Sequence, residues 1–538
     1  MNYKVVIPSA GLGSRIGPHT KFLNKALVTI GDKPAISRVI DKFAPEIPIV
    51  VLLGYKGDMI REVLMQLYPN RDITFIDVDL YEGEGSGLGY TLCKAEECLQ
   101  CPFIFIPNDT VTGMDVIDLD PNNYGNWAAY YRKVDTDNYN PEIFRTLILS
   151  ENEDEVVDIT GKGTLNPVIY MGICGVSDYA DFWKAMKSND AIKAGEVFGL
   201  RALNYIKAIQ INEWYDIGSL QNLEIAKEKF KSADHNILEK EDEAIWFSGN
   251  EVLKFSIHED FILDRVERLK YLPERLMPKL LGQGKYTYKY RKVKGKVIAD
   301  TLTTDRLRNL LNICNSSMWS NIKVSDDAKS ACYEFYRDKT YSRLEHYLHR
   351  FEQYDDPKTL NGIKVESVRA LLGKVDWEEL CESPHWSPFH GDFHGENIIA
   401  DEKGGFTLLD WRQCFGKNSK KYGDAYYDLA KLKHGLLVNH GVVNANDFTV
   451  NEMAHNYVFI SIKQHSNLLE CDNELDIWLV ENSFDPKKVK LLTALIYLNI
   501  CGLHEYPYAK FLYLYGQKLL SDYFFARRGF SANELVVA

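Results

Sequence analysis

The sequence has little cysteine and no long hydrophobic run. Ten cysteines are scattered over 538 residues, which excludes the disulfide framework of a small secreted domain and fits reduced thiols. The longest apolar segments, such as 493–503, are far shorter than the ~20 residues that a membrane-spanning helix needs. The first residues also lack the charged and apolar regions of a signal peptide. We therefore expect a cytoplasmic protein with no membrane partner.

Positive charge is also scarce. The 63 Lys and Arg residues are outnumbered by 76 Asp and Glu residues, which gives a formal net charge of −13 at pH 7. A chain of this sign has no general attraction to phosphate backbones, so nucleic acid is excluded as the main partner. Glycine and proline number 36 and 18, near the usual share, and no repeat or low-complexity tract is present. Collagen-like, repeat and disordered classes are therefore excluded.

The first ~230 residues alternate short β-rich runs with helical patterns. Residues 4–7, 73–78 and 103–106 have the pattern of strands, and 48–53 is an unbroken apolar run typical of a strand buried on both faces. Apolar residues recur at helical spacing between 60 and 67. This alternation predicts an open, mostly parallel, Rossmann-like α/β sheet with flanking helices, whose ligands lie beyond the carboxyl ends of the strands.

A polar, charged stretch near 228–243 has little to bury, and it predicts a domain boundary. We expect a first domain at 1–232, a linker at 233–243 and a second domain at 244–538. The second domain is β-rich to about residue 300 and largely helical afterwards.

The turn after the first strand contains Gly11 and Gly13, followed by Arg15 and Lys25. Glycines let the backbone approach a phosphate chain and direct N–H donors at it. The two cations can offset the charge that builds up when a phosphorus atom is attacked. The glycines alone fit a tight strand-to-helix turn equally well, and it is Arg15 and Lys25 that favour phosphate chemistry.

With these residues, 3–226 resembles the sugar-nucleotidyltransferase superfamily, phosphocholine cytidylyltransferases in particular. Its signature is Gly-x-Gly-Thr-Arg followed by Pro-Lys-x-Leu, from which Ser14 and Asn24 depart. The resemblance implies nucleotidyl transfer with Arg15 and Lys25 as catalytic residues. It also implies a set of nucleotide-binding glycines, namely Gly11, Gly13, Gly85 and Gly87.

Two carboxylates behind the glycine turn resemble the metal-binding pair of this family. Asp109 follows the strand at 103–106, and Asp216 lies in a Trp-Tyr-Asp-Ile-Gly segment. Either residue alone would be a turn or cap residue, but two carboxylates at strand ends can share a hard cation such as Mg²⁺. Lys162 resembles a lysine that holds the acceptor's phosphate, and a solvated lysine is the alternative. For Gly85 and Gly87 the alternative is a plain turn.

The second domain contains a predicted hairpin with strands at 398–401 and 406–409. Its closure brings Asn397, before the first strand, beside Asp410, after the second. An amide oxygen and a carboxylate in this arrangement form a magnesium clamp for ATP phosphates. Asp392, on the preceding loop, is then placed to accept the proton of a hydroxyl or to orient that hydroxyl for attack.

The pattern His-x-Asp-x-His-x-x-Asn at 390–397, with Asp-Trp at 410–411, resembles the aminoglycoside phosphotransferase and choline kinase superfamily. The resemblance covers about 244–520 and implies a bilobal α+β kinase-like fold. In such a fold Asp392 is catalytic, Asn397 and Asp410 are metal ligands, and ATP binds. It also implies that Lys254 holds nucleotide phosphates, with Glu267 as its ion-pair partner. Arg412 is a departure, because choline kinases usually carry Glu at this position.

Two further features lie downstream. Asp424 and Asp428 are expected to cap a helix and support the predicted site. The aromatic cluster at 506–515 has two interpretations, a cage for a quaternary ammonium group or the core of the C-terminal helices.

Together the two motifs lead to one hypothesis. A kinase makes a phosphomonoester, and a nucleotidyltransferase consumes one, so we expect consecutive steps on one chain. The second domain would phosphorylate a small alcohol or sugar with ATP. The first would join the resulting phosphate to a nucleotide, with CTP favoured over another NTP, Mg²⁺ as cofactor, and a CDP-activated alcohol, polyol or sugar as product. Such a product would serve surface polysaccharide or capsule biosynthesis.

Three other functions remain open. One is a sugar-1-phosphate uridylyl- or guanylyltransferase with an attached sugar kinase. Another is a non-catalytic nucleotide-sensing scaffold, although drift has no reason to retain every charged residue of both motifs. The third is an antibiotic-modifying kinase, for which a fused nucleotidyltransferase has no obvious use. The sequence does not determine the acceptor or the oligomeric state.

Overall fold

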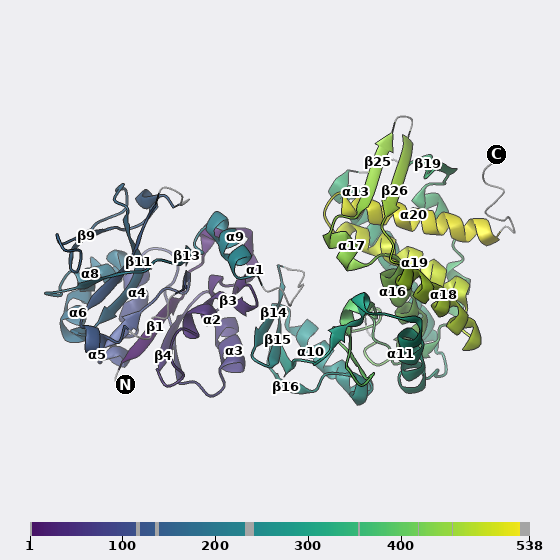
Figure 1. Cartoon of the computed structure of the whole chain (residues 1–538). Coiled ribbons are helices and arrows are strands. Elements are labelled where there is room, and N and C mark those ends of the chain that lie inside the picture. Colours follow the sequence, from purple (N-terminus) through teal and green to yellow (C-terminus); the bar gives the residue numbers. More distant parts are fainter. Residues whose placement is uncertain are drawn as a thin grey trace. The chain divides into compact units, whose positions relative to one another are not determined.

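The structure, a computed structural model, describes residues 3–113, 119–134, 139–231, 241–352, 356–417, 419–453 and 456–527 (Figure 1). The chain forms two compact units. The first comprises Met1–Ile262 and Leu280–Arg291, and the second comprises Leu263–Lys279 and Lys292–Ala538. Within the described ranges, no helix combines the length and the apolar character needed to cross a bilayer.

A seven-stranded sheet forms the centre of the first unit. Its strands, in spatial order, are β12 (Lys207–Gln210), β8 (Trp127–Arg132), β11 (Val168–Val176), β6 (Phe103–Phe105), β1 (Lys4–Ser9), β4 (Ile49–Leu53) and β5 (Ile73–Asp77). All neighbours are parallel except that β11 is antiparallel to both β6 and β8. The predicted open, mostly parallel α/β sheet is confirmed.

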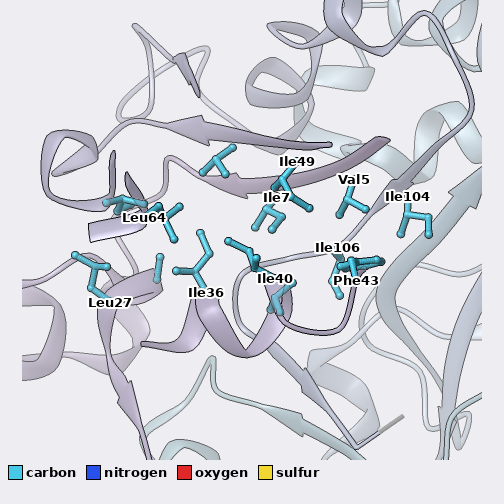
Figure 2. Packing of buried hydrophobic residues seen from close by; sticks show 14 of the residues in the cluster. Val5, Ile7, Leu27, Ile36, Ile40, Phe43, Ile49, Leu64, Ile104 and Ile106 are labelled. Carbon is cyan, nitrogen blue, oxygen red and sulfur yellow. The ribbon is translucent and has the colours of Figure 1, made fainter. Parts of the chain in front are cut away.

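The inner strands β4 and β6 are apolar throughout because both faces of the sheet are buried there. Val5 and Ile7 of β1 enter one core, whereas Val6, between them, enters the core on the opposite face. Figure 2 shows the first of these cores, where Ile36 and Ile40 of α2 (Ala35–Ile40) pack near the strands. Alternating side chains of a strand point to opposite faces, so an unbroken apolar run serves both cores at once.

Helices cover both faces of the sheet. α2 and α3 (Gly57–Leu67) contribute to the first core. The second core receives side chains from α4 (Leu88–Cys93), α6 (Tyr179–Met186) and α8 (Glu196–Leu200). The remaining helices of this part are α1 (Pro18–Phe22), α5 (Pro121–Tyr124), α7 (Ala191–Ala194) and α9 (Leu220–Lys229).

A second sheet belongs to the same compact unit. It has the order β14 (Glu243–Ser248), β15 (Glu251–Ser256), β17 (Thr287–Arg291) and β16 (Leu280–Gln283). Trp246 and Phe255 from this sheet are members of the first core, and the Trp246 indole donates a hydrogen bond to Thr29 Oγ1 at 3.0 Å. The first unit therefore continues past the predicted boundary. Most of the predicted linker, 233–243, lies outside the described residues.

Glu62 of α3 anchors the turn before β17. Its carboxylate accepts hydrogen bonds from the backbone N–H groups of Lys285, at 2.9 Å, and Tyr286, at 2.8 Å, and from Thr287 Oγ1 at 2.7 Å. Asp58, one turn earlier on α3, accepts a hydrogen bond from the Tyr286 hydroxyl at 2.8 Å. Hydrogen bonds to a charged acceptor are stronger than those between neutral groups. These contacts therefore hold the second sheet in place against α3.

The second unit is mainly helical after the end of α10 (Glu259–Arg268). Figure 1 shows α16, α18, α19 and α20 packed against one another. The helices are α11 (Thr304–Ser317), α12 (Asp326–Cys332), a π-helical segment (Tyr333–Asp338), α13 (Lys339–Phe351), α14 (Val368–Leu372), α15 (Trp377–Glu382), α16 (Ala425–Leu437), α17 (His440–Asn444), α18 (Ser466–Glu481), α19 (Pro486–Ile500) and α20 (Tyr508–Arg527).

Small sheets complete the second unit. One has the order β18 (Lys296–Val297), β22 (Ile398–Ala400) and β23 (Phe406–Leu408), and another has the order β20 (Ile363–Lys364), β19 (Thr359–Leu360), β26 (Tyr457–Ile462) and β25 (Phe448–Met453). β21 (Trp386–Ser387) pairs with β24 (Gly423–Asp424). β22 and β23 pair antiparallel, which confirms the predicted hairpin.

Replacing Glu62 with Ala tests the anchoring of the second sheet. The change leaves two backbone N–H groups without their acceptor, at a cost of about 2–4 kcal/mol. We expect amide exchange of segment 280–291 to speed up by about tenfold or more, measured by hydrogen–deuterium exchange on the full chain. Glu151, an exposed carboxylate of the same unit, provides the control substitution Glu151→Ala. Unchanged exchange in the Glu62 variant would show that the contact does not hold the sheet.

Candidate active sites

The first site begins at the glycine turn after β1. Gly13 has φ 66°, and a Cβ there would lie 2.9 Å from Thr20 Cγ2, so glycine is required at this position. Asn24, which departs from the family signature, accepts a hydrogen bond from the Ala26 N–H at 2.9 Å and donates one to Ser9 O at 3.1 Å. Asn24 therefore fixes the path of the chain into Lys25 by hydrogen bonding.

Asp109 and Asp216 are brought together by a short antiparallel pair, β7 (Thr110–Thr112) and β13 (Trp214–Asp216). Asp216 pairs with Thr110, and the N–H of Ile217 donates to Asp109 O at 3.0 Å. Lys25 Nζ lies 2.5 Å from Asp109 Oδ2. The two carboxylates predicted as metal ligands are therefore neighbours, with a lysine on one of them.

The electrostatics of this pair differ between its two members. Burial would raise the pKa of Asp109, but Lys25 and Arg15 hold it below its ordinary value. Burial and the nearby Asp109 raise the pKa of Asp216 to about 6. Two carboxylates held close and buried repel one another when both are ionised. A divalent cation with oxygen ligands would remove that repulsion, so the donor set fits Mg²⁺.

These residues surround a cavity of about 510 Å³. Of the residues that the sequence singled out for this site, Gly85 is not part of the lining. The others do line it: Gly11, Gly13, Arg15, Lys25, Gly87, Asp109, Lys162 and Asp216. Gly87 packs closely, because a Cβ there would lie 2.4 Å from Ile192 O. The structure thus gathers into one cavity residues that are up to two hundred positions apart.

Sequence reasoning missed two charged residues of this cavity, Arg145 and Glu196. Burial lowers the pKa of Lys162, and the positive charges of Arg15 and Arg145 lower it further. Three positively charged side chains, Arg15, Arg145 and Lys162, therefore lie close enough in this cavity to affect one another. Burial raises the pKa of Glu196 to about 7. Neither residue lies in a local motif, so the only signal for them is the folded structure.

The second site forms around the hairpin of β22 and β23. Ile398 pairs with Leu408, and the N–H of Leu409 donates to Asn397 O at 2.7 Å. Asp410, the next residue, adopts φ 56° and lies 3.3 Å from Arg265 Nη1. The hairpin therefore brings Asn397 and the chain at Asp410 together, as the sequence predicts.

Asp392 is held by three side chains. Lys431 Nζ of α16 lies 2.8 Å from Asp392 Oδ1. The Asn397 amide donates to Oδ2 at 3.1 Å and also contacts His394 Nε2 at 3.1 Å. Burial would raise the pKa of Asp392, but Lys431 and His394 hold it well below its ordinary value. Asp392 is therefore ionised and fixed in direction.

Two buried residues brace the loop that carries Asp392. Asp428 accepts hydrogen bonds from the N–H groups of His390, at 2.7 Å, and Gly391, at 2.6 Å. Arg268, with no exposed surface, donates to the carbonyl oxygens of Phe389 and Arg412. Asp424 caps α16 through the Tyr426 N–H, which confirms the expectation for Asp424. Sequence reasoning missed Arg268, which lies in an ordinary amphipathic helix.

The two remaining nucleotide-binding predictions lie in different compact units. Lys254 is on β15 of the first unit and is buried. Glu267 belongs to the second unit, where its carboxylate lies 2.8 Å from Lys420 Nζ. The structure therefore gives Glu267 a partner that the sequence did not predict.

The aromatic cluster at 506–515 contributes to the helical core. Phe511 and Tyr513 are buried, and the Tyr513 ring stacks on Tyr347 with 4.7 Å between centroids. Of the two interpretations, core packing agrees with this arrangement.

Among the described residues, no group of three or more His, Cys, Asp or Glu side chains is arranged to hold a metal.

Comparison with curated proteins finds relatives for part of the chain. The bifunctional protein GlmU of Methanococcus aeolicus is 23% identical over 222 residues, which are 40% of this chain and 51% of GlmU. AglF of Haloferax volcanii, a UTP–glucose-1-phosphate uridylyltransferase by name, is 22% identical over 246 residues, 42% of this chain and 96% of AglF. The chain thus spans about half the length of the first relative. The N-terminal region resembles sugar nucleotidyltransferases.

Solved structures cover a similar share. HddC from Yersinia pseudotuberculosis is 24% identical with a TM-score of 0.35, and the match covers 43% of this chain and 100% of HddC. CTP:phosphocholine cytidylyltransferase (LicC) from Streptococcus pneumoniae is 19% identical with a TM-score of 0.34, covering 43% and 100%. No protein-family model matches the chain. The kinase-like fold of the second unit stays a prediction.

Glu196 makes the stability of the first unit depend on pH. Its pKa of about 7, against an ordinary 4.5, means that the folded chain keeps a proton that the unfolded chain releases as the pH rises from 4.5 to 7. Stability therefore falls over this window, by on the order of 3 kcal/mol. We expect Glu196→Gln to gain stability relative to the native chain between pH 4.5 and 8, measured by denaturant unfolding. If the difference in unfolding free energy between Glu196→Gln and the native chain does not change with pH, the prediction is contradicted. Such a pH-independent difference is what we expect of Glu151→Gln.

Arg268→Met tests the brace of the second site. Met fills much of the space but leaves two carbonyl oxygens without donors, which costs about 1–3 kcal/mol each. We expect the thermal midpoint of the second unit to fall by roughly 5–10 °C, measured by calorimetry. Lys270→Met, at an exposed position beyond the same helix, should leave the midpoint unchanged. Equal midpoints for both variants would rule out the bracing role.

Proposed function

We propose that the chain is a bifunctional enzyme that activates a small hydroxylated metabolite in two steps. The second unit transfers the γ-phosphoryl group of ATP to a hydroxyl. The first unit transfers a nucleotidyl group, CMP by preference, to the new phosphate and releases pyrophosphate. The product, a CDP-activated alcohol, polyol or sugar, would serve surface polysaccharide or capsule biosynthesis. The observation that carries the proposal is the assembly of Arg15, Lys25, Asp109, Lys162 and Asp216 around one cavity.

In the first reaction site, a phosphate oxygen of the acceptor attacks the α-phosphorus of the NTP. A new O–P bond forms, and the bond from that phosphorus to the α–β bridging oxygen breaks. Arg15 and Lys25 would offset the charge on the departing pyrophosphate. Lys162 would hold the acceptor's phosphate, and the glycine turn with Gly87 would bind the nucleotide through its backbone.

In the second site, the acceptor hydroxyl attacks the γ-phosphorus of ATP. The O–P bond forms while the bond to the β–γ bridging oxygen breaks, and ADP leaves. Asp392 orients the hydroxyl and takes its proton, a role that its ionised state supports. Lys254 stays a proposed ligand of nucleotide phosphates, on the strength of the sequence resemblance alone. Glu267 is proposed as a nucleotide-site residue as well, acting beside Lys420.

Magnesium is the proposed cofactor of both sites. Asp109 and Asp216 would hold it in the first, and the Asn397 amide oxygen with Asp410 in the second. Bound there, the ion would offset the negative charge of the transferred group. The Asn397 amide nitrogen donates to Asp392, which leaves the amide oxygen as the ligand atom.

A second candidate is a sugar-1-phosphate uridylyltransferase with an attached sugar kinase. The match to AglF, which spans nearly all of that uridylyltransferase, favours it. The two candidates differ in the base that the first unit accepts. Pyrophosphate release from CTP, UTP, GTP and dTTP, each with a panel of phosphorylated alcohols and sugar 1-phosphates, separates them.

Two single substitutions should separate the two activities. Asp109→Asn should lower NTP-dependent pyrophosphate release by about 10²–10⁴-fold and leave ATP-dependent phosphorylation intact. Asp392→Asn should do the reverse, with a loss of about 10²–10⁴-fold in phosphorylation. Phosphorus NMR on the full chain follows both products at once. The exposed residues Asp181 and Asp305 give matched Asp→Asn controls, and loss of both activities in either site variant would refute two independent sites.

A further inference from the structure

Four basic side chains lie close to one another beside the loop that carries Asp392 in the second unit, and one of them contacts Asp392 directly. Lys339 and Arg343 lie one turn apart on α13, Arg412 follows β23, and Lys431 is on α16. Three separate elements thus deliver positive charge to one place. Such a convergence does not arise from a local motif.

The positions of these cations follow from their contacts. Lys339 Nζ lies 4.1 Å from the centroid of the Phe335 ring, and Arg412 Cζ lies 4.9 Å from the same centroid. Arg412 Cβ also lies within 2.5 Å of the point where a Cβ on Gly391 would be. Gly391 directly precedes Asp392. Lys339 and Arg412 therefore lie against one aromatic ring, next to the loop that carries the carboxylate.

Acidic partners for these charges are scarce. Within the described residues, no carboxylate lies within 4.0 Å of the cationic groups of Lys339, Arg343 or Arg412, and Lys431 pairs with Asp392 alone. The buried Nε of Arg412 has no hydrogen-bond partner. Burial and the neighbouring charges of Arg412, Arg343 and Lys431 lower the pKa of Lys339 well below its ordinary value. Positive charges that repel one another and lack anions are costly to hold unless a ligand neutralises them.

We propose that the acceptor of this site is an anion, an alcohol that carries a carboxylate or a phosphate beside the hydroxyl to be phosphorylated. The inference rests on the proposed kinase function and narrows its substrate class. Arg343 and Arg412 would bind the acceptor's anionic group through charge-assisted hydrogen bonds. Asp392 would face the hydroxyl, and Lys431 would hold Asp392 in place. A quaternary ammonium alcohol such as choline would be repelled.

The test compares acceptors that differ in one charged group. The full chain, ATP and magnesium are incubated with glycerate or glycerol, serine or ethanolamine, gluconate or glucose, glycerol 3-phosphate, and choline. ADP formation gives the rates, and phosphorus NMR identifies the phosphomonoester. We expect kcat/KM for an anionic acceptor to exceed that of its neutral or cationic counterpart by tenfold or more. The glycerate and glycerol 3-phosphate arms distinguish a carboxylate from a phosphate.

Variants show which ligand the cations serve. Arg343→Gln and Arg412→Gln should each raise KM for the anionic acceptor by about tenfold and leave KM for ATP within about twofold. Arg337→Gln, an exposed arginine that precedes α13, is the matched control and should change neither constant. Arg412→Glu should shift the preference toward the neutral or cationic counterpart.

Several outcomes would overturn the proposal. Equal or better use of neutral or cationic acceptors is one, and variants that raise KM for ATP alone are another, because the cations would then serve the nucleotide. If no acceptor is phosphorylated, the kinase function itself fails, and calorimetry with the same acceptors and a non-hydrolysable ATP analogue tests the anion site separately. If the anionic acceptors bind to the native chain and both Gln variants abolish that binding, the anion site stands even without the kinase function. If no anionic acceptor binds, the anion site is refuted together with the kinase function.

Discussion

The close approach of Asp109 and Asp216 is the constraint on which the first site depends. Two buried carboxylates repel each other, and the fold overcomes this repulsion with the β7–β13 pairing and the ion pair from Lys25. The apolar core on both sides of the sheet supplies the rigidity that holds them there. The second site also holds groups of like charge close together, but these groups are positive: several cations lie near one carboxylate. In both sites, groups of like charge therefore lie close together, and a bound ligand of opposite charge would reduce their repulsion.

Local patterns predicted most of what is local in the structure. The strands at 48–53 and 103–106 and the hairpin that brings Asn397 to Asp410 follow from apolar runs and turn residues. The glycine turn and the two carboxylates at strand ends were also found, because the local segments around them resemble those of a known family. Arg145, Glu196, Arg268 and Lys431 were not found as site residues. Each lies in a segment of ordinary helix or loop pattern, and only long-range packing brings it to a site.

The domain boundary shows why charge patterning was insufficient. A polar stretch near 228–243 indicates that few residues there need burial, but it does not show where the next apolar segment packs. Trp246 and Phe255 belong to the first core, and Glu62 accepts backbone hydrogen bonds from the 285–287 turn. Burial of a large aromatic side chain stabilises by about 1.5–3 kcal/mol, and this contribution is independent of the charged run that precedes it. Packing, rather than chain polarity, sets the limit of the compact unit.

In the proposed two-step reaction, the charge of the intermediate would link the two chemistries. A phosphorylated acid carries at least two negative groups, so the site that consumes it must offer more than one cation. The cavity of the first unit meets this requirement, because Arg15, Arg145 and Lys162 line it together. Burial and the positive charges of Arg15 and Arg145 lower the pKa of Lys162. One cation would hold the attacking phosphate, and the others would be available for a second anion. The phosphate ester of a neutral alcohol carries no second anionic group, so some of these cations would have no partner on it. An anionic acceptor would therefore find cations in both sites: Arg15, Arg145 and Lys162 in the first, and Arg343 and Arg412 in the second.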